Sequence, residues 1–569
     1  MFLPTTRQEM NKLGWDSLDV ILVTGDSYID SPYVGVAVIG KFLFKHGFRV
    51  GIIAQPVIND VSDLGRLGEP ELFWGVSAGC VDSMVANHTA LKKKRRSDDY
   101  TPGGLNNRRP DRASIVYSNL IRRLSNQIHP QTQAKPIVLG GIEASLRRVA
   151  HYDFWDNKIR RALLFDAKAD FLLYGMAENS ALALANGLKN ETDPRSVGGL
   201  CYISNEKPGE YLELPSFEDV VQEKILFTEM FHTFYRNNDP LNAKGLAQKH
   251  ADRYLVQNPP FQYQTQEELD EVFSLNYEYK QHPFYEKIGP VKALETIRFS
   301  ISTHRGCYGE CNFCAIAVHE GRTVRWRSQD SILAEAELLT KTEGFKGYIQ
   351  DVGGPTANMY GYECGKKLKT GSCQDQRCLS PDVCPALKVN HLPNINLLKQ
   401  IRKIKGIKKV FVSSGIRYDL LFSDINYCDD YMHELTNHHV SGQLKVAPEH
   451  SQANVLEKMG KPDNKNLLRF KEKFDEYSRS AGKNQFLTYY MIAAHPGCDE
   501  ADMQKLKTFS SKKLNINPEQ VQIFTPTPST YSTLMYYTEQ DPFTGKPIFV
   551  EKVPERKQKQ KEIIIQKNG

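Results

Sequence analysis

Short apolar runs alternate with amphipathic segments over the N-terminal part of the chain. The run VILVT (20–24) is apolar and β-branched, which is typical of a buried parallel strand. Segment 34–48 then repeats apolar residues at helical spacing and reaches Gly47, and RVGIIAQP (49–56) predicts the next strand. Strand, helix and strand form one βαβ unit. Further strands are predicted at 72–79, 136–145 and 171–175. The pattern predicts a doubly wound, Rossmann-like α/β domain over residues 1–215.

The remainder of the chain divides into three further segments. Residues 216–290 are polar and aromatic with proline breaks, which predicts a helical connector. Residues 291–545 contain apolar runs separated by helical patterns such as NINLLKQIRKI (394–404), so we expect parallel β/α layering. Residues 546–569 are charged and predict a frayed tail or an exposed helix. The six strands expected after residue 290 lie near 297–302, 347–352, 408–413, 442–447, 486–492 and 521–525.

Composition restricts the class of protein. A chain of 569 residues is too long for one core and predicts two or three domains. No run approaches the ~20 apolar residues of a membrane span, and the polar N-terminus lacks a signal-peptide pattern, so we expect a cytoplasmic protein without a membrane partner. The net charge of +6 says little about nucleic acid. Eleven cysteines without an export signal favour metal or redox chemistry over a disulfide scaffold.

Two features of the N-terminal domain are candidates for ligand binding. The basic loop 91–113 is either a solvated loop or one that folds over an anionic ligand, where its Gly pair permits close backbone approach. Strand-end loops at 25–26 and 140–143, together with Arg147 and Arg148, are expected to line the face turned toward the second domain. The alternative for GGIEASLRR is a strand-to-helix turn capped by polar groups.

Three cysteines lie within eight residues in THRGCYGECNFCAIAVHEGR. Cys307, Cys311 and Cys314 have the spacing C-x3-C-x2-C, and no fourth cysteine follows closely. A structural zinc site fills four positions, for which His319 is the nearest additional candidate, and a four-cysteine cluster needs a fourth thiolate. Three ligands in a tight loop after a strand instead leave one metal of a cluster open to a small molecule.

This spacing resembles the signature of the radical S-adenosylmethionine enzymes. The stretches HRGCYGECNFCAI, GGPTANMYG, SSGIRYD, KVAPEHS and AAHPGC, and GGIEASLRRVAHYDFWDNKIRRALLFDAKADFLLYGMAE earlier in the chain, resemble the uncharacterised YgiQ-type proteins of that group. The resemblance implies a partial (β/α)6 barrel after a cobalamin-binding-like domain. It also implies a 4Fe-4S cluster on the three cysteines, S-adenosylmethionine on the open iron, and a reductant such as flavodoxin or ferredoxin. It supplies no substrate.

The resemblance also indicates residues around the cofactor. Glycines 353 and 354 stand where the family binds the methionine amino group, although Pro355 replaces the usual acidic residue and Asp351 is nearby. His304 and His495 are candidate bases, with ordinary hydrogen bonding as the alternative. The implied cofactor-binding residues are Phe313, Gly353, Gly354, Ser413, Ser414, Arg417 and Glu449.

Other functions remain open at this point. A cobalamin-dependent radical methyltransferase would be supported by a D-x-H-x-x-G stretch, which the sequence lacks, although some related domains bind cobalamin without it. A methylthiotransferase usually has three further cluster cysteines upstream, whereas only Cys80 and Cys201 precede Cys307. The non-enzyme alternative is an iron–sulfur protein that binds RNA through loop 91–113.

A second metal site is predicted in the cysteine-rich insertion 360–391. Four thiols amid Gly, Pro and Lys have few apolar neighbours, and such a segment needs something to order it. They could bind zinc or an auxiliary cluster, with His391 as a substitute ligand. The alternative is a set of reduced surface thiols, since the C-x2-C spacing typical of zinc is absent. The four residues are Cys364, Cys373, Cys378 and Cys384.

Overall fold

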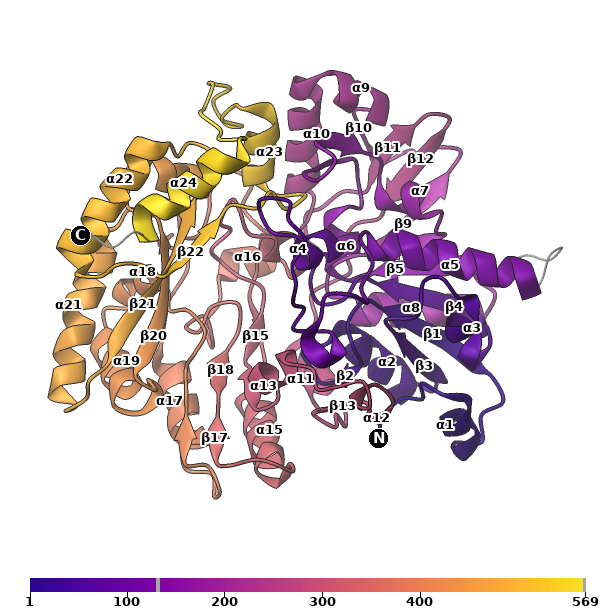
Figure 1. The fold of residues 1–569 in the computed structure, drawn as a ribbon, viewed down its shortest axis with the longest axis horizontal. Helices are drawn as coiled ribbons and strands as arrows, with labels where there is room; N and C mark the ends of the chain where they lie inside the picture. Colours follow the sequence, from indigo (N-terminus) through magenta and orange to yellow (C-terminus); the bar gives the residue numbers. More distant parts are fainter. Residues whose placement is uncertain (129–133, 566–569) are drawn as a thin grey trace. The chain divides into compact units, whose positions relative to one another are not determined.

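The computed structural model describes residues 1–128 and 134–565, which form two compact units (Figure 1). Unit 1 contains residues 1–263 and 271–298, and unit 2 contains residues 264–270 and the chain from Phe299 onward. Most of the predicted connector 216–290 therefore belongs to unit 1. The chain passes from unit 1 to unit 2 between Arg298 and Phe299, a few residues after the boundary predicted at 290/291.

Five parallel strands form the core of the unit 1 sheet. Their order in space is β3-β1-β4-β5-β8, so the chain passes from β1 to β3 on one side and then continues from β4 on the other. The order of strands reverses between β1 and β4, which makes their carboxyl ends the topological switch point. The strands are β1 (Leu18–Thr24), β3 (Val50–Ala54), β4 (Pro70–Ser77), β5 (Ile137–Gly140) and β8 (Phe171–Leu173).

Two groups of helices pack on these strands. Helix α2 (Gly35–Lys45) contacts β1, β3 and helix α8 (Glu178–Lys189). Helix α5 (Ala113–Ile128) contacts β4 and the short helices α3 (Val61–Leu64) and α7 (Leu163–Ala167). The predicted βαβ unit is present, and the two helical groups fit a doubly wound sheet.

The sheet continues beyond β8 with strands of mixed direction. Strands β9, β12 and β11 pair antiparallel in turn, and β10 adds parallel to β11. The prediction of a parallel sheet is therefore correct for the first five strands and wrong for this extension. The added strands are β9 (Leu200–Ser204), β10 (Leu212–Leu214), β11 (Leu246–His250) and β12 (Arg253–Gln257).

The predicted helical connector also contains the β11–β12 hairpin. Helices α9 (Phe217–Gln222) and α10 (Lys224–Arg236) precede it as expected. The hairpin then turns at Ala251, whose φ of 53° is left-handed. Leu246 and Leu255 are each 1% exposed, so burial against the sheet stabilises these short strands more than local propensity would.

Unit 2 contains the six predicted parallel strand positions. Strand β14 pairs with β18, β17 pairs with β19, and β20, β21 and β22 form a three-stranded sheet. Backbone hydrogen bonds from Val412 to His439 and from Ile416 to Lys445 connect the regions of β19 and β20. The strands are β14 (Ser300–Ser302), β17 (Tyr348–Ile349) with β18 (Asp351–Gly353), β19 (Lys409–Val410), β20 (Gln443–Glu449), β21 (Phe486–Ala493) and β22 (Gln520–Ile523).

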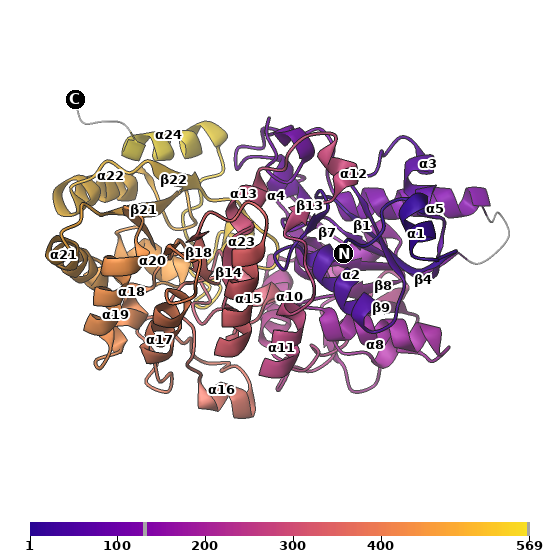
Figure 2. The ribbon, with the colours of Figure 1, turned by 90° about the horizontal axis from the view of Figure 1, so that it is seen from below.

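A row of helices accompanies these strands. Figure 2 shows α15, α17, α19 and α21 following one another, and each contacts the next. None of the helices in the described part of the chain is long and apolar enough to cross a membrane. The helices of the row are α15 (Gln329–Lys341), α17 (Leu392–Ile401), α19 (Cys428–Glu434) and α21 (Lys465–Ser480).

The predicted charged tail is in large part a packed helix. Helix α24 (Pro554–Ile565) contacts β21, β22 and helix α22 (Glu500–Phe509). Gln560 is fully buried, and its Oε1 accepts the backbone N–H of Ala494 at 2.9 Å. Lys557, Ile563 and Ile564 are also buried, so four inward residues hold a helix whose other positions are mostly charged or polar. Residues 566–569 lie outside the described part.

Candidate metal and cofactor site

The three-cysteine loop lies after β14 in unit 2, where the sequence predicts it. The short strand β15 (His304–Arg305) leads into the loop, and helix α14 (Ile316–His319) follows it. Gly306 has a φ of 80°, and a Cβ there would lie 2.5 Å from the carbonyl oxygen of Thr323, so only glycine fits. The Gly306 N–H donates to Glu320 Oε2 at 3.0 Å, and the Cys314 N–H donates to the Cys311 carbonyl at 3.0 Å.

Two of the cysteine sulfurs lie on one side of Gly309. A Cβ at Gly309 would be 3.2 Å from Cys307 Sγ and 3.7 Å from Cys311 Sγ, and the Gly309 N–H donates to Cys307 Sγ at 3.3 Å. Burial, followed by the charge of Cys311, raises the pKa of the Cys307 thiol to about 11. The same two causes raise the pKa of Cys314. Thiols whose ionisation is disfavoured in this way, as at Cys307 and Cys314, suit a cationic cluster, whose charge replaces their protons.

Arg417, predicted from SSGIRYD, does lie beside this loop. Its Nη1 donates to Cys311 Sγ at 3.7 Å, and its Nε donates to Asp419 Oδ1 at 2.9 Å. The Arg417 N–H donates to Asn358 Oδ1 at 2.9 Å, which fixes the start of helix α18 (Tyr418–Ser423). The charges of Asp419, Cys311 and Cys307 raise the pKa of Arg417 against the opposing effect of burial. A guanidinium placed here offsets the negative charge that thiolates or a cluster would bring.

Glu449 ends β20 in a strained position near Arg417. Its φ is 67°, which is unusual for a residue other than glycine, and it is 8% exposed. Burial raises the pKa of its carboxyl group, while Lys461 and then Arg417 lower it. Lys461 Nζ lies 3.5 Å from Glu449 Oε1. The charge of Arg417 thus acts on the carboxyl group of Glu449.

The two predicted glycines lie where two segments touch. A Cβ at Gly353 would be 2.9 Å from Ser414 Oγ, and one at Gly354 would be 2.7 Å from the ring of His304. The Thr303 N–H donates to the Gly353 carbonyl at 2.7 Å. Both positions therefore require glycine for close packing.

Asp351, Ser413 and Ser414 bind one another. The backbone N–H groups of Ser413 and Ser414 donate to Asp351 Oδ1 at 2.7 and 3.0 Å. The Ser414 hydroxyl donates to Asp351 Oδ2, and the Ser413 hydroxyl donates to the Gln350 carbonyl at 2.7 Å. Asp351 therefore joins the second and third strand positions of the unit, and it is already engaged by three donors.

Phe313 and His495 are neighbours. Their rings make an edge-on contact with centroids 6.3 Å apart. His495 Nδ1 lies 2.8 Å from the Pro496 carbonyl, so it carries the proton, and Nε2 accepts the Ser532 hydroxyl at 2.6 Å. Burial lowers the pKa of His495 to about 3 and that of His304 to about 4. Both histidines are therefore neutral near pH 7.

The four cysteines of the insertion have different surroundings. Cys364 and Cys378 lie in an apolar cluster with Tyr308 and Leu379. Cys373 and Cys384 both raise the pKa of the exposed Lys366, and the Cys384 N–H donates to the Cys378 carbonyl at 2.8 Å. Within residues 1–128 and 134–565, no three His, Cys, Asp or Glu side chains converge closely enough to hold a single metal ion. The thiolates of a 4Fe-4S cluster each bind a different iron and stand farther apart than the ligands of one ion. The second metal site stays a prediction.

His391 is not directed at these cysteines. Its Nδ1 lies 2.9 Å from Asp424 Oδ2 and its Nε2 lies 3.2 Å from Asn358 Nδ2. Both ring nitrogens are therefore occupied, and the substitute-ligand prediction for His391 finds no support in this geometry.

Sequence reasoning missed the residues that tie the insertion to the cysteine loop. Arg377 donates to the Glu310 carbonyl at 3.0 Å and to Asn312 Oδ1 at 2.6 Å, on either side of Cys311. The buried Lys367 donates from Nζ to the Arg322 carbonyl at 2.6 Å. Asp419, the partner of Arg417, was also missed. Its position could have indicated this role, because an acidic residue two positions after a predicted site arginine is a natural partner.

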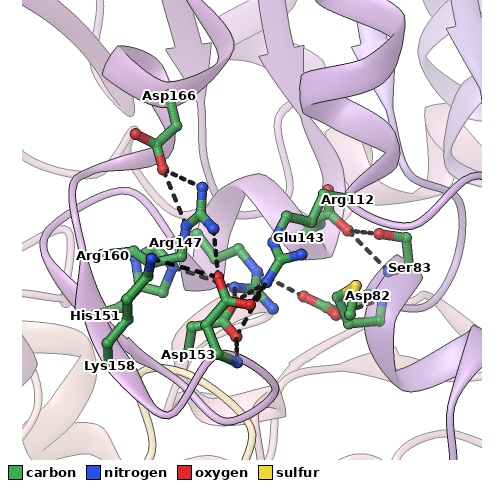
Figure 3. Close-up of polar contacts among 12 residues, drawn as sticks. Asp82, Ser83, Arg112, Glu143, Arg147, His151, Asp153, Lys158, Arg160 and Asp166 are labelled. Atoms are coloured by element: carbon green, nitrogen blue, oxygen red, sulfur yellow. Dashed lines mark hydrogen bonds and ion pairs between the residues drawn. The ribbon is translucent and has the colours of Figure 1, made fainter.

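In unit 1, the predicted strand-end residues bind one another (Figure 3). Glu143 accepts the Ser83 N–H at 2.8 Å. Arg147 donates to Asp82 Oδ2 at 2.8 Å and to Asp153 Oδ2 at 3.1 Å.

Arg148 is likewise engaged inside unit 1. It is fully buried and donates to Gln257 Oε1 at 3.0 Å and to Asn238 Oδ1 at 2.7 Å. It also lies over the Tyr174 ring at 4.2 Å. The polar groups of GGIEASLRR thus hold unit 1 together, and a direct role for them in binding a ligand stays a prediction.

Comparison with known proteins agrees with the motifs. The family described as "Radical SAM N-terminal" matches residues 2–300. The UPF0313 protein of Fusobacterium nucleatum is 56% identical over 566 residues, covering 100% of this chain and 99% of that protein. The UPF0313 protein of Thermotoga maritima is 48% identical over 573 residues, covering 100% and 99%.

A similar fold occurs in a solved structure. The radical S-adenosylmethionine methyltransferase TsrM from Kitasatospora setae, with cobalamin and a [4Fe-4S] cluster bound, gives a TM-score of 0.50 at 14% identity over 91% of this chain and 74% of that chain. At this identity the likeness concerns the fold alone. From the family match and the full-length relatives, the chain belongs to the UPF0313 family, the YgiQ-type radical S-adenosylmethionine proteins of unknown function.

Proposed function

We propose that this protein is a radical S-adenosylmethionine enzyme whose 4Fe-4S cluster is held by Cys307, Cys311 and Cys314. The observation that carries the proposal is that the Cys307 and Cys311 sulfurs lie together beside Gly309, in the loop that also holds Cys314, with Arg417 donating to Cys311. The six strand positions of unit 2 and the row of helices beside them support a partial barrel of the kind typical of such enzymes. When bound, the cluster would supply one-electron reductive cleavage of S-adenosylmethionine to a 5′-deoxyadenosyl radical.

The chain's own residues hold and orient these groups. Arg417 balances the negative charge of the thiolates, and Asp419 fixes its orientation through paired hydrogen bonds. Gly353 and Gly354 let Ser414 and His304 pack against this strand end, where the backbone groups of the two glycines would contact the methionine end of the cofactor. Glu449 and Lys461 provide a carboxylate and an ammonium group for its ribose or carboxylate.

Two further parts of the proposal are the role of Phe313 and the source of the electron. Phe313 presents an aromatic ring beside the neutral His495 at this loop. An external reductant such as flavodoxin or ferredoxin supplies the electron, and we place the protein in the cytoplasm. The substrate lies beyond this proposal.

The spectroscopic test uses anaerobically reconstituted protein. Electron paramagnetic resonance of the reduced cluster should change when S-adenosylmethionine is added, because the cofactor binds the open iron directly. The Cys307→Ala/Cys311→Ala/Cys314→Ala variant should give no cluster signal. A wild-type spectrum that is identical with and without S-adenosylmethionine would count against the proposal. That outcome would favour an iron–sulfur protein that binds RNA through loop 91–113.

A cobalamin-dependent radical methyltransferase is the second candidate. The fold shared with cobalamin-bound TsrM favours it. It requires that unit 1 offer room for a corrinoid, which can be examined in unit 1 by itself.

A further inference from the structure

Doubly wound sheets bind ligands in the crevice outside the carboxyl ends of their strands, at the switch point. In unit 1 this point lies between β1, which ends at Thr24, and β4, which ends at Ser77. A cofactor bound by this domain in the usual way would occupy the space above these two strand ends. The contacts of the loops that follow β1 and β4 therefore decide whether a ligand fits.

The chain itself crosses this position. We call residues 98–109 the crossing segment; it is the second half of the predicted basic loop 91–113. The Ser27 N–H, just after β1, donates to the Tyr100 carbonyl at 2.9 Å. Gln55, just after β3, donates from Nε2 to Thr101 Oγ1 at 2.7 Å and to the Gly25 carbonyl at 2.8 Å.

A buried ionic cluster connects the crossing segment to the ends of β1 and β4. The Arg109 side chain is 0% exposed, and its Nη2 lies 2.5 Å from Asp26 Oδ1 and 3.2 Å from Asp98 Oδ2. Its Nε donates to the Gly25 carbonyl at 3.2 Å. Asp26 also accepts the Cys80 N–H, just after β4, at 2.6 Å. One arginine thus connects the segment to the ends of β1 and β4.

The two strand-end loops are already in contact with each other. A Cβ at Gly25 would lie 2.2 Å from the Ala78 carbonyl oxygen and 3.2 Å from Arg109 Cγ. A Cβ at Gly79 would lie 2.2 Å from Asp26 Oδ1. In dinucleotide-binding folds, glycines at these turns let the backbone approach the ligand. Here they let the chain approach itself.

The outer side of the crossing segment is held by the chain as well. The Gly103 N–H donates to the Pro290 carbonyl at 2.9 Å, and the Ala293 N–H donates to the Asp99 carbonyl at 2.8 Å. A Cβ at Gly289 would lie 2.9 Å from Gly103 Cα. The segment is therefore held between the strand ends and residues 289–293 of the same unit.

We propose that residues 98–109 are the permanent occupant of the switch-point crevice, so that unit 1 binds neither cobalamin nor a nucleotide there. The basic half of the loop, Lys92 to Arg96, stays exposed, while the crossing segment replaces the ligand. This proposal is independent of S-adenosylmethionine cleavage, because it concerns only unit 1 and would hold whatever the cysteine loop binds.

The first experiment uses the full-length reconstituted protein with hydroxocobalamin and, separately, NAD. Equilibrium dialysis measures binding, and hydrogen–deuterium exchange compares residues 24–27 and 98–109 with and without each probe. We expect no change of exchange in these two segments, whether or not a probe binds elsewhere. One equivalent of either probe bound with altered exchange in these segments would overturn the proposal.

The second experiment tests whether Arg109 holds the crossing segment in place. In the wild type, the amides of residues 98, 100, 101, 103, 104 and 106, which donate hydrogen bonds within the unit, should exchange slowly. Arg109→Ala should speed this exchange roughly tenfold or more, whereas Arg108→Ala, the adjacent arginine, should not. Fast exchange in the wild type, or equal exchange in both variants, would contradict the proposal. If Arg109→Ala does not fold, Gln55→Ala takes its place, since it removes the bond to Thr101.

Discussion

The guanidinium of Arg417 donates to the sulfur of Cys311 at 3.7 Å while Asp419 holds its other edge at 2.9 Å. Asp419 orients Arg417, and Arg417 contacts the cysteine loop. Arg417 and Asp419 lie more than a hundred residues from Cys311 in sequence. A fixed positive charge at a ligating sulfur favours the reduced, more negative form of a cluster.

Arg417→Gln should therefore lower the reduction potential of the reconstituted cluster by roughly 60–130 mV. The size follows because a charge-assisted hydrogen bond contributes about 1.5–3 kcal/mol and about 1.4 kcal/mol corresponds to 59 mV for one electron. A redox titration followed by electron paramagnetic resonance measures the shift. Arg417→Lys, which keeps the charge, should shift less, and equal potentials for wild type and Arg417→Gln would refute this role.

Arg377→Ala should weaken the cysteine loop without unfolding unit 2. It removes the bonds to the Glu310 carbonyl and to Asn312, each worth about 1 kcal/mol. Loss of iron to a chelator, followed by absorbance, should become faster. Lys369→Ala, an exposed basic position in the same insertion, is the matched control. If both variants lose iron at the wild-type rate, the insertion does not support the loop.

Substitution of the insertion cysteines should have unequal effects. Cys378→Ser places a hydroxyl among apolar side chains and should lower the free energy of unfolding by about 1–3 kcal/mol. Cys373→Ser, at a partly exposed position, should change it by less than about 0.5 kcal/mol. Urea titration in the presence of a chelator measures both. Equal large losses in metal-loaded protein, together with zinc in the purified wild type, would instead support a four-thiolate site.

Acid should destabilise unit 1 through His250. Burial between Phe165 and Phe217 lowers the pKa of His250 to about 3 from its ordinary 6.5. Between these values the unfolded chain binds a proton that the folded chain does not, so stability falls as pH falls below about 6.5. His250→Phe should reduce the loss between pH 6.5 and pH 5 by about 1–2 kcal/mol, measured by urea titration. An unchanged pH slope in His250→Phe would disprove the assignment.

The sequence predicted those parts of the molecule that rest on local patterns. The buried strands β1, β3 and β4 are continuous apolar runs, and the three-cysteine loop has a fixed spacing after a strand. The hairpin β11–β12 was missed because LAQKH and RYLVQ become strands only through burial against β9. The crossing segment was missed because its pairing of Asp26 with Arg109 joins residues 83 positions apart.

The same limit explains the candidate site. The motif located Cys307, Cys311, Cys314 and Arg417, since each lies in a recognisable stretch. Arg377 and Lys461 act through contacts between distant segments, which no local pattern announces.

The assay of 5′-deoxyadenosine tests the central claim most directly. Wild-type protein, reconstituted anaerobically with iron and sulfide, is mixed with S-adenosylmethionine and dithionite, and the product is quantified by chromatography. We predict that 5′-deoxyadenosine forms with the wild type and is absent with the Cys307→Ala/Cys311→Ala/Cys314→Ala variant. Equal product from both proteins, or none from a wild type that carries its full cluster, would contradict the account.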